Sequence, residues 1–276
     1  MKIDCSDFNL AATLESGQVF GFEKDAKGAY SGVIAGHPVR LSQRTQSHGE
    51  ALEVSFTGLM PPHGAASGRV REFFDLGRDM TPIFSIIEGE PALAPALSSF
   101  RGLRIISQDP WEALACFILS SNNNVKRIMG IHRNMVAHFG GFPTSLQVAK
   151  SHERILRGLG LGYRAPFLLH TAQFLSVNPF YLESVRHADY DEAYSRVLAF
   201  PGIGPKVADC VLLYGFHRLD AFPVDVWILR AVRKLFFRNR SVSEARVHAF
   251  GRKRWGALSG YVQQYLFHGA RTGVLY

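Results

Sequence analysis

Apolar and polar positions alternate with a period of two over much of the first 60 residues. Leu52, Val54 and Phe56 share one side of such a segment, and a second alternating segment covers residues 37–43. This period is typical of strands that bury one face. Turn-forming residues lie between two apolar stretches at 25–28, and the expected strands are joined by short links. The pattern therefore predicts an antiparallel sheet.

Beyond about residue 72 the apolar positions recur at helical spacing. Asp109 is a good N-cap, Pro110 suits the first helical position, and the apolar residues that follow share one face. Met60–Arg69 is expected to be a loop and a domain boundary. Five further stretches have helical spacing: 151–165 (ending in glycines), 190–200, 206–215, 228–236 and 260–271.

This change of period predicts an α+β, mostly helical fold with two domains. A small antiparallel β domain is expected over residues 1–72 and a larger helical domain over 73–276. The chain has 276 residues, 47% of them hydrophobic, so it can bury a sizeable core. Its formal net charge of +8 indicates a polyanionic partner, although many basic proteins bind no nucleic acid.

The cysteines and the hydropathy exclude several classes of protein. Cys5, Cys116 and Cys210 are odd in number and far apart, which fits neither a disulfide framework nor a zinc or iron–sulfur site. No apolar run approaches the roughly 18 residues that a membrane helix needs. The N-terminus has no signal-peptide core. We therefore expect a soluble, cytoplasmic protein with no membrane partner.

The segment FPGIGPKVADC, residues 200–210, places two glycines between two expected helices at about 190–215. Gly202 and Gly204 can adopt a positive φ and let a phosphate approach the backbone N–H groups that open the second helix. Such a helix–hairpin–helix unit grips a nucleic-acid backbone without reading its sequence. An ordinary turn between helices with a glycine cap explains the same residues equally well.

Lys206 and Asp225 are the residues near this hairpin that could carry chemistry. The helix dipole and partial burial would both favour the neutral, nucleophilic amine of Lys206. For a single lysine, a solvated side chain or a phosphate contact is the more common interpretation. Asp225 precedes a helical stripe, so it can cap that helix. Held ionised there, it could also stabilise positive charge on a sugar or move protons.

Together these segments resemble the helix–hairpin–helix–Gly/Pro–Asp superfamily of DNA glycosylases, and within it the 8-oxoguanine DNA glycosylases. Each motif is short and weakly specific, whereas six in the same order are highly specific and span nearly the whole chain. We expect a bacterial member of this family. The similarity is carried, in chain order, by LESGQVFGF, SSNNNVKRI, LGLGYRA, PGIGPKVADC, PVDV and QQYLF.

The resemblance implies a bifunctional DNA glycosylase and AP lyase that excises 8-oxoguanine from duplex DNA in base excision repair. The damaged nucleotide is flipped out of the duplex, and Lys206 attacks the sugar C1′. The resulting Schiff base leads to β-elimination, and Asp225 assists both steps. The carbonyl of Gly17 would accept a hydrogen bond from N7–H, which guanine lacks. The other lesion-base contacts implied are Gln263 at the Watson–Crick edge, Phe267 and Cys210 on the two faces, and Pro223.

The resemblance also implies contacts with the rest of the DNA. Asn122 would fill the vacated stack, and Tyr163 would wedge beside it. Arg127 and Arg164 would hydrogen-bond the orphaned cytosine, which predicts a preference for cytosine opposite the lesion. By residue type alone, each arginine is equally a phosphate contact, Phe267 is core packing, and the asparagines form a C-cap and turn.

Two positions depart from the family pattern. Trp227 stands where animal enzymes have a histidine that contacts a phosphate, and Pro205 lacks an N–H directly before the lysine. The backbone carbonyls of Leu198, Phe200 and Ile203 match a hairpin cation site, which would hold a monovalent ion or calcium. No cofactor and no iron–sulfur cluster are expected, and we expect a monomer.

Three other functions fit part of the sequence. A non-enzymatic helix–hairpin–helix DNA-binding protein would explain the charge and the hairpin, but not Lys206 together with Asp225. A glycosylase for oxidised pyrimidines, or for adenine opposite 8-oxoguanine, would usually carry four cysteines near the C-terminus, and no cysteine follows Cys210. A monofunctional alkylbase glycosylase would have the aspartate without the lysine.

Overall fold

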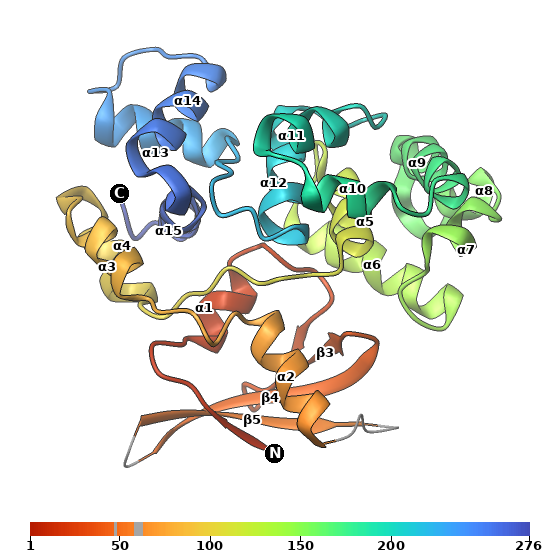
Figure 1. Ribbon diagram of the computed structural model, residues 1–276, viewed down its shortest axis with the longest axis horizontal. Coiled ribbons are helices and arrows are strands. Elements are labelled where there is room, and N and C mark those ends of the chain that lie inside the picture. The colour runs from red at the N-terminus through yellow and green to blue at the C-terminus, as the bar shows by residue number, and fades with distance from the viewer. Residues whose placement is uncertain (47–48, 58–62) are drawn as a thin grey trace. The chain divides into compact units, whose positions relative to one another are not determined.

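The computed structural model describes residues 1–46, 49–57 and 63–276 (Figure 1). Contacts within the chain group it into two compact units. The first, here unit 1, joins Met1–Ser107 to Val224–Tyr276, and the second, unit 2, is Gln108–Pro223. These units divide the chain at positions other than the domain boundary expected between residues 72 and 73, which stays a prediction.

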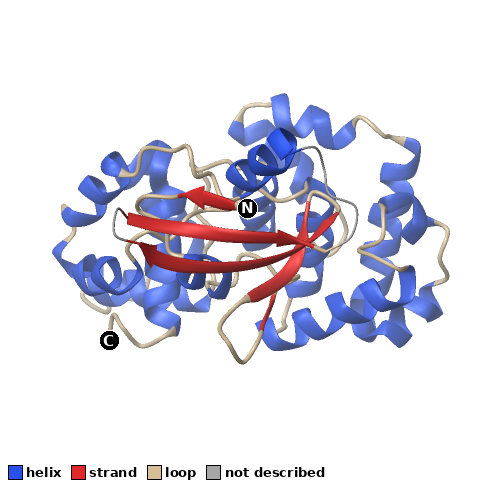
Figure 2. Ribbon diagram, turned by 90° about the horizontal axis from the view of Figure 1, so that it is seen from below, coloured by secondary structure: helices blue, strands red, loops and turns tan. Residues whose placement is uncertain are grey.

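Unit 1 opens with the antiparallel sheet that the alternation predicts, drawn in red in Figure 2. Its strands follow the order β1-β5-β4-β3-β2. Leu41 of β4 pairs with Val54 of β5, and both side chains are buried, as is Leu52. Phe56 packs at the edge of the same core and is partly buried. The strands are β1 Lys2–Asp4, β2 Glu23–Lys24, β3 Tyr30–Ile34, β4 His37–Gln46 and β5 Gly49–Phe56.

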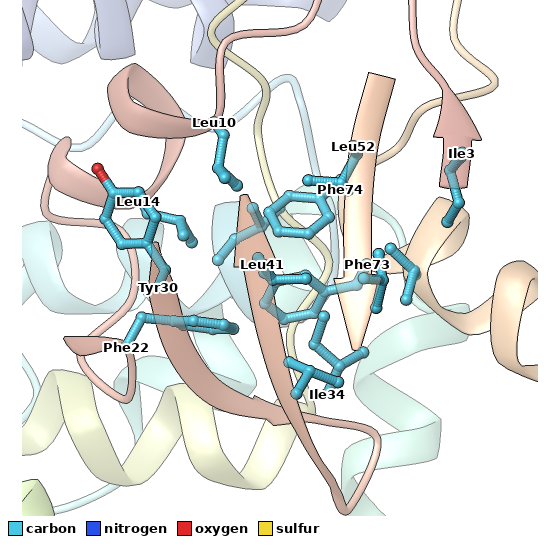
Figure 3. Packing of buried hydrophobic residues seen from close by; sticks show 14 of the residues in the cluster. Ile3, Leu10, Leu14, Phe22, Tyr30, Ile34, Leu41, Leu52, Phe73 and Phe74 are labelled. Atoms are coloured by element: carbon cyan, nitrogen blue, oxygen red, sulfur yellow. The ribbon is translucent and has the colours of Figure 1, made fainter. Parts of the chain in front are cut away.

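The apolar face of this sheet is covered by side chains from α1 (Leu10–Glu15) and α2 (His63–Phe73) (Figure 3). Phe73 and Phe74 meet edge to face, with ring centroids 4.9 Å apart. Edge-to-face contact suits the ring quadrupoles and adds to the area that the pair buries. The packing therefore fixes α1, and the turn that follows it, against the sheet.

The expectation of a loop over Met60–Arg69 is wrong from His63 onward, and residues 58–62 lie outside the described chain. Helix α2 buries Ala66, Val70 and Phe73, which recur at a spacing of four and three residues. That spacing places them on one face of a helix. Proline and glycine nearby hide the stripe in the sequence.

The remaining helices of unit 1 come from two parts of the chain (Figure 1). Helices α3 and α4 come after the sheet in the sequence, and α13, α14 and α15 form the C-terminal part of the chain. Trp255 Nε1 and Arg254 Nε both donate to Glu90 Oε1, at 2.9 and 2.5 Å, which joins the end of α14 to the start of the α4 region. The helices are α3 Thr81–Glu88, α4 Ala94–Phe100, α13 Val226–Phe236, α14 Glu244–Trp255 and α15 Ser259–Arg271, with 3₁₀ turns at Pro91–Leu93 and Gly256–Leu258.

The regular elements of unit 2 are helices and helical turns, joined by short loops. Asp109 accepts a hydrogen bond from Glu112 N at 2.9 Å and Pro110 is the first residue of α5, which confirms the predicted helix start. Its elements are α5 Pro110–Ser120, α6 Val125–Phe139, α7 Ser145–Ala149, α8 Glu153–Leu156, a π turn Arg157–Leu161, a 3₁₀ turn Gly162–Arg164, α9 Ala165–Val177, α10 Tyr181–His187, α11 Tyr190–Leu198 and α12 Pro205–Gly215.

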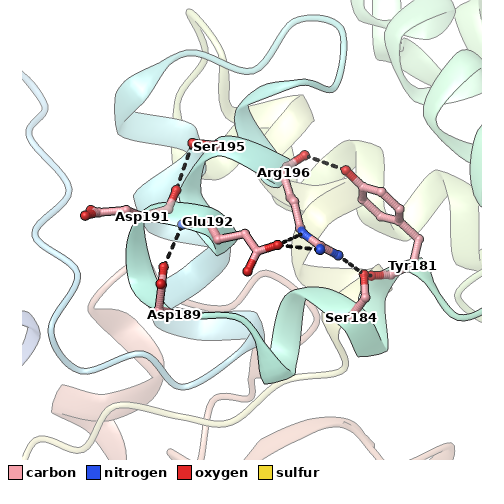
Figure 4. A network of polar contacts seen from close by, with 7 residues as sticks. All are labelled: Tyr181, Ser184, Asp189, Asp191, Glu192, Ser195 and Arg196. Carbon is pink, nitrogen blue, oxygen red and sulfur yellow. Dashed lines mark hydrogen bonds and ion pairs between the residues drawn. The ribbon is translucent and has the colours of Figure 1, made fainter.

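A polar network ties α10 to α11 (Figure 4). Arg196 donates to Glu192 Oε1 one turn earlier, at 2.6 Å, and also to the hydroxyl of Ser184. Tyr181 donates its hydroxyl to the Arg196 carbonyl at 3.1 Å. Asp189 caps α11 by accepting from Glu192 N at 2.9 Å. The orientation of α11, the first helix of the hairpin, is thus fixed by its neighbour.

The three cysteines are all described, and none of them forms a disulfide; each thiol is buried. Burial raises the pKa of the Cys116 thiol well above its ordinary value, and the nearby Glu112 carboxylate adds to the rise. In the part of the chain that the structure describes, no helix is both long and apolar enough to cross a membrane.

Arg104 is the largest fully buried side chain in unit 1, with 2% of its surface exposed. Its guanidinium bonds main-chain carbonyls rather than a carboxylate. Nη1 donates to the Asp75 and Arg78 carbonyls at 3.0 Å each, and Nε donates to Asp7 O at 3.1 Å. Desolvation lowers the pKa of Arg104. The side chain therefore joins three segments of backbone at one point.

Replacing Arg104 with Met should destabilise the protein by about 3 kcal/mol or more, because several buried carbonyls would lose their donors. Arg101→Met is the matched control. Arg101 is exposed; it makes two long ion pairs and its guanidinium lies 3.9 Å from the centroid of the Phe84 ring, so its loss should cost about 1 kcal/mol or less. Urea unfolding at equilibrium measures both free energies, and equal values for the two variants would contradict this role for Arg104.

Candidate functional site

The hairpin between α11 and α12 is a tight turn built around Gly202. Phe200 N donates to Val197 O at 3.2 Å, and Ile203 N donates to Phe200 O at 3.3 Å. Gly202 has φ +78°, and a Cβ built there would lie 2.3 Å from Cδ2 of Phe167. Both its conformation and its close packing therefore require glycine. Ser121 Oγ donates to Gly202 O at 3.3 Å.

Gly204 does not adopt the positive φ expected for it. It is the N-cap of α12 with φ −102° and ψ 178°, and among the described atoms none lies within 4 Å of a Cβ built there. The reason is that an N-cap residue is extended, a conformation open to any residue. Within the described chain, α12 has no side-chain cap at this end. The positive end of its helix dipole is therefore not offset by a capping side chain.

Lys206 is the second residue of α12 and is half-buried. Its Nζ lies 3.4 Å from Ser120 Oγ, at the end of α5, and 5.6 Å from the centroid of the Phe117 ring. The Phe117 ring stacks on Tyr214 with centroids 5.3 Å apart. Cys210, one helical turn after the lysine, is buried. The amine is thus held beside one hydroxyl and an aromatic wall.

A buried hydrogen bond links the two helices of the hairpin below this lysine. Tyr190, the first residue of α11, donates its hydroxyl to Asp209 Oδ1 at 2.5 Å, and Asp209 is 1% exposed. Burial of Tyr194 raises the pKa of its phenol, and the Asp209 carboxylate raises it further. Because a buried carboxylate needs such donors, this pair fixes α11 and α12 to each other.

Unit 2 also contains the loop of three asparagines, residues 122–124, between α5 and α6. Tyr163 and Arg164, which are expected near the opposite base, lie in the same unit. Asn122 is exposed and has φ 48°. Arg164 is only 2% exposed; its Nε donates to Ser121 O at 2.8 Å and its Nη2 to Asn122 O at 2.8 Å. Tyr163 donates its hydroxyl to Ser121 O at 3.1 Å. In this structure Arg164 therefore holds the loop backbone.

Arg127 differs from Arg164 in being exposed. It lies in the first turn of α6, where Asn124 caps the helix by accepting from Arg127 N at 2.9 Å. The third asparagine of the loop thus begins the next helix. That both arginines read an opposite base stays a prediction.

In unit 1, Asp225 is the N-cap of α13, as expected: its Oδ1 accepts from Ile228 N at 2.9 Å. Arg271, at the end of α15, lies close enough for the Asp225 charge to raise its pKa, against the larger lowering by desolvation. Trp227 is partly exposed, with the guanidinium of Arg230 5.9 Å from its ring. The aspartate is held in place by the helix that it caps.

Three of the residues expected to read the lesion base, Gly17, Gln263 and Phe267, lie in unit 1, whereas Cys210 and Pro223 lie in unit 2. Gly17 lies in the turn after α1 and has φ +79°. Gln264 of α15 donates its Nε2 to Ser16 O in that turn at 3.0 Å, and its neighbour Gln263 is 3% exposed. Phe267, one turn later on the helix, is partly exposed. Helix α15 and the Gly17 turn are therefore in direct contact.

The positive charge near Phe267 comes from Arg271, whose guanidinium lies 5.5 Å from the phenyl ring. Next to it, burial and, to a smaller extent, the charge of Arg271 lower the pKa of His268 to about 4. The imidazole is therefore neutral at neutral pH and packs on Phe100, with ring centroids 4.2 Å apart.

Sequence reasoning missed Ser120, Phe117, Gln264 and Arg271. Only Arg271 had a signal, since it follows Phe267 by four residues and so shares its helix face. Pro223 is buried at the end of unit 2. No group of three or more His, Cys, Asp or Glu side chains suited to a metal ion occurs over the described ranges.

Two family models match the chain. One, described as the N-terminal domain of 8-oxoguanine DNA glycosylase, covers residues 1–114; the other, described as HhH-GPD superfamily base excision DNA repair protein, covers residues 115–257. The chain is 31% identical to a probable N-glycosylase/DNA lyase of Methanothermobacter thermautotrophicus, over 100% of this chain and 97% of that one. It is 32% identical to the N-glycosylase/DNA lyase of Saccharomyces cerevisiae, over 85% of this chain and 70% of that one.

A solved structure is similar over almost its full length. It is the Clostridium acetobutylicum 8-oxoguanine glycosylase/lyase in complex with double-stranded DNA that contains cytosine opposite 8-oxoguanine. The TM-score is 0.88 at 27% sequence identity, and the match covers 99% of this chain and 97% of that one.

The two hairpin glycines should respond differently to alanine. Gly202→Ala should destabilise the protein by about 2–4 kcal/mol, because Ala would be strained at positive φ and its Cβ would overlap Phe167. Gly204→Ala is the matched control and should cost less than about 1 kcal/mol. Thermal unfolding of both variants measures the difference. A Gly202→Ala variant as stable as Gly204→Ala would contradict the requirement for glycine.

Proposed function

The chain belongs to the HhH-GPD superfamily of base excision DNA repair proteins, and on this premise we propose that it is a bifunctional DNA glycosylase and AP lyase that excises 8-oxoguanine from duplex DNA. The observation that carries the proposal is a lysine in the first turn of α12, directly after the glycine hairpin and beside Ser120. A monofunctional glycosylase needs no amine in that position, and a simple DNA-binding hairpin would use one only as a phosphate contact.

In the proposed mechanism the amine of Lys206 attacks C1′ of the flipped nucleotide. The C1′–N9 bond breaks, and the base leaves with the bonding electron pair and takes up a proton. Opening of the sugar ring then gives a protonated Schiff base between Nζ and C1′. Loss of a C2′ proton breaks the C3′–O3′ bond by β-elimination, and water finally releases the enzyme. The attack requires the neutral form of the amine, because only that form has a lone pair to give to C1′.

Asp225 would act as the carboxylate partner of these steps. A carboxylate that accepts from a helix N-terminus stays ionised, as the hydrogen bond from Ile228 N supports. An ionised carboxylate stabilises positive charge that develops on the sugar, and it can accept and return protons during the elimination.

Recognition of the two edges of the lesion base would rest on residues of unit 1. The Gly17 carbonyl accepts a hydrogen bond from N7–H of 8-oxoguanine, whereas guanine presents a lone pair at N7. Gln263 would bind the Watson–Crick edge, and Phe267 would stack on the base. The buried thiol of Cys210 and the ring of Pro223 would add apolar contacts. The direct contact between α15 and the Gly17 turn supports this division of roles.

The remaining contacts with DNA would be made mainly by unit 2. The helix start after Gly202 and Gly204 would bind a backbone phosphate, since the α12 dipole favours an anion there. Trp227 could donate one indole hydrogen bond to a phosphate. Arg127 is exposed and would reach the base opposite the lesion, with Asn122 and Tyr163 beside the vacated stack.

We also propose that the carbonyls of Leu198, Phe200 and Ile203 hold a structural monovalent cation or calcium. A carbonyl oxygen has two lone pairs, so Phe200 O can accept from Ile203 N and still ligate a cation. The cation would offset the partial negative charges of the carbonyl oxygens in the turn. It would also place a positive charge near a DNA phosphate. Since the substrate is genomic DNA, the protein would act in the cytoplasm, at the nucleoid of a bacterial cell.

Borohydride trapping tests the nucleophile. Wild-type protein mixed with an 8-oxoguanine:cytosine duplex and sodium borohydride should give a covalent protein–DNA adduct, because reduction fixes the Schiff base. Lys206→Gln should give none. Lys150→Gln, an exposed lysine at the end of α7, is the matched control and should trap like wild type.

Either of two results would contradict this assignment. Base release without trapping by the wild type would mean a monofunctional glycosylase and another role for Lys206. Binding of the duplex without base release or trapping would leave only a DNA-binding function.

The preference for cytosine tests Arg127. Wild-type protein should excise 8-oxoguanine faster opposite cytosine than opposite adenine, and Arg127→Ala should lower that ratio about tenfold or more by loss of charged hydrogen bonds. Arg133→Ala, also exposed on α6, should lower both rates equally or leave them unchanged. Single-turnover excision rates at fixed salt give the ratio. A ratio unchanged by Arg127→Ala would reduce this side chain to a phosphate contact.

A further inference from the structure

The turn that contains Gly17 is held by hydrogen bonds from two sides. On one side is Gln18, whose side chain is 0% exposed. Its amide contacts four partners in the core of unit 1, so the residue after Gly17 cannot turn without breaking buried hydrogen bonds. Gln18 Nε2 donates to Thr13 O at 3.0 Å, Ser16 Oγ at 3.1 Å and Arg104 O at 2.8 Å, and Gln18 Oε1 accepts from Ile106 N at 2.9 Å.

On the other side are two residues of α15. Gln264 is 0% exposed, and its Nε2 donates to Ser16 O at 3.0 Å. Arg271 donates its Nη2 to the Glu15 carbonyl, at the end of α1. The peptide groups directly before Gly17 are therefore bound by the same helix that carries Gln263 and Phe267.

We propose that Gln264 is a positioning residue that sets how strongly the enzyme discriminates 8-oxoguanine from guanine. The inference rests on the proposed function, since it assumes that Gly17 and Gln263 bind the base. Gln264 does not bind the base itself. It fixes the distance between the Gly17 turn and α15, and so between the Gly17 carbonyl and Gln263, which would meet different edges of the same base.

This distance matters because the two bases differ only at C8 and N7, and of these the Gly17 carbonyl would meet N7. The Gly17 carbonyl attracts the N7–H of 8-oxoguanine and repels the N7 lone pair of guanine, and both effects require that the carbonyl does not move. Gly17 has φ +79° and carries no side chain, so the position of its carbonyl depends on the hydrogen bonds of its neighbours Ser16 and Gln18. If the Ser16 carbonyl lost its donor, the turn could retreat from guanine and weaken its hold on 8-oxoguanine.

Binding measurements in a Lys206→Gln background test the proposal, because no excision then competes. The dissociation constants for duplexes with 8-oxoguanine or guanine opposite cytosine are measured at one salt concentration, since affinity for DNA depends on salt. Gln264→Met keeps the size of the side chain and removes its donor. We expect the guanine-to-8-oxoguanine ratio of dissociation constants to fall about tenfold, as loss of one buried hydrogen bond implies.

Tyr265→Phe is the matched control. Tyr265 is the next residue on α15, is 0% exposed, and donates its hydroxyl to Phe100 O at 3.1 Å, away from the Gly17 turn. This variant should lower the melting temperature about as much as Gln264→Met and leave the ratio unchanged. If Gln264→Met does not fold, Gln264→Asn, which keeps the amide but is one methylene too short, takes its place.

The outcomes distinguish failure of the role proposed for Gln264 from failure of the proposed function. A fall in the ratio for the Gln264 variant alone supports the proposal. An unchanged ratio, or an equal loss of affinity for both duplexes, overturns it and leaves Gln264 a purely structural residue. If the Lys206→Gln protein itself shows no preference for 8-oxoguanine, the proposed function fails, and this inference fails with it.

Discussion

The placement of the proposed nucleophile depends on one steric constraint, the contact between Gly202 and Phe167. A Cβ at Gly202 would lie 2.3 Å from the ring, so only glycine lets the hairpin turn this closely. The turn ends directly at α12, and Lys206 follows two residues after its N-cap. The buried Tyr190–Asp209 hydrogen bond then fixes the two helices. The backbone conformation required at Gly202 thus determines where the amine of Lys206 lies.

The elements with strong local signals were predicted from the sequence. The alternation of apolar and polar residues predicted the antiparallel sheet. Asp109 and Asp225 are the N-caps of α5 and α13, as expected. Helix α2 was missed because glycine and proline hide its apolar stripe. The site was predicted where a motif carries it, as for Lys206. The Lys206–Ser120 and Gln264–Ser16 contacts join residues 86 and 248 positions apart, and no local pattern encodes such pairs.

Arginine has a structural role in this protein that net charge conceals. Arg104 and Arg164 are each 2% exposed and bond main-chain carbonyls of segments far away in the chain. The planar guanidinium presents several donors in fixed directions, so one side chain can satisfy several carbonyls at once. Part of the formal charge of +8 is therefore committed to holding loops, and less of it faces a polyanion than the composition indicates.

The burial of all three thiols has a consequence for the conditions under which such an enzyme works. Its proposed substrate forms when oxidants attack guanine, and the same oxidants convert reactive thiols to sulfenic and sulfinic acids. That reaction begins from an accessible thiolate. Cys116 is fully enclosed and its raised pKa keeps it protonated, while Cys210 is 4% exposed. Burial of the thiols therefore limits their oxidation under the same conditions that form the proposed substrate.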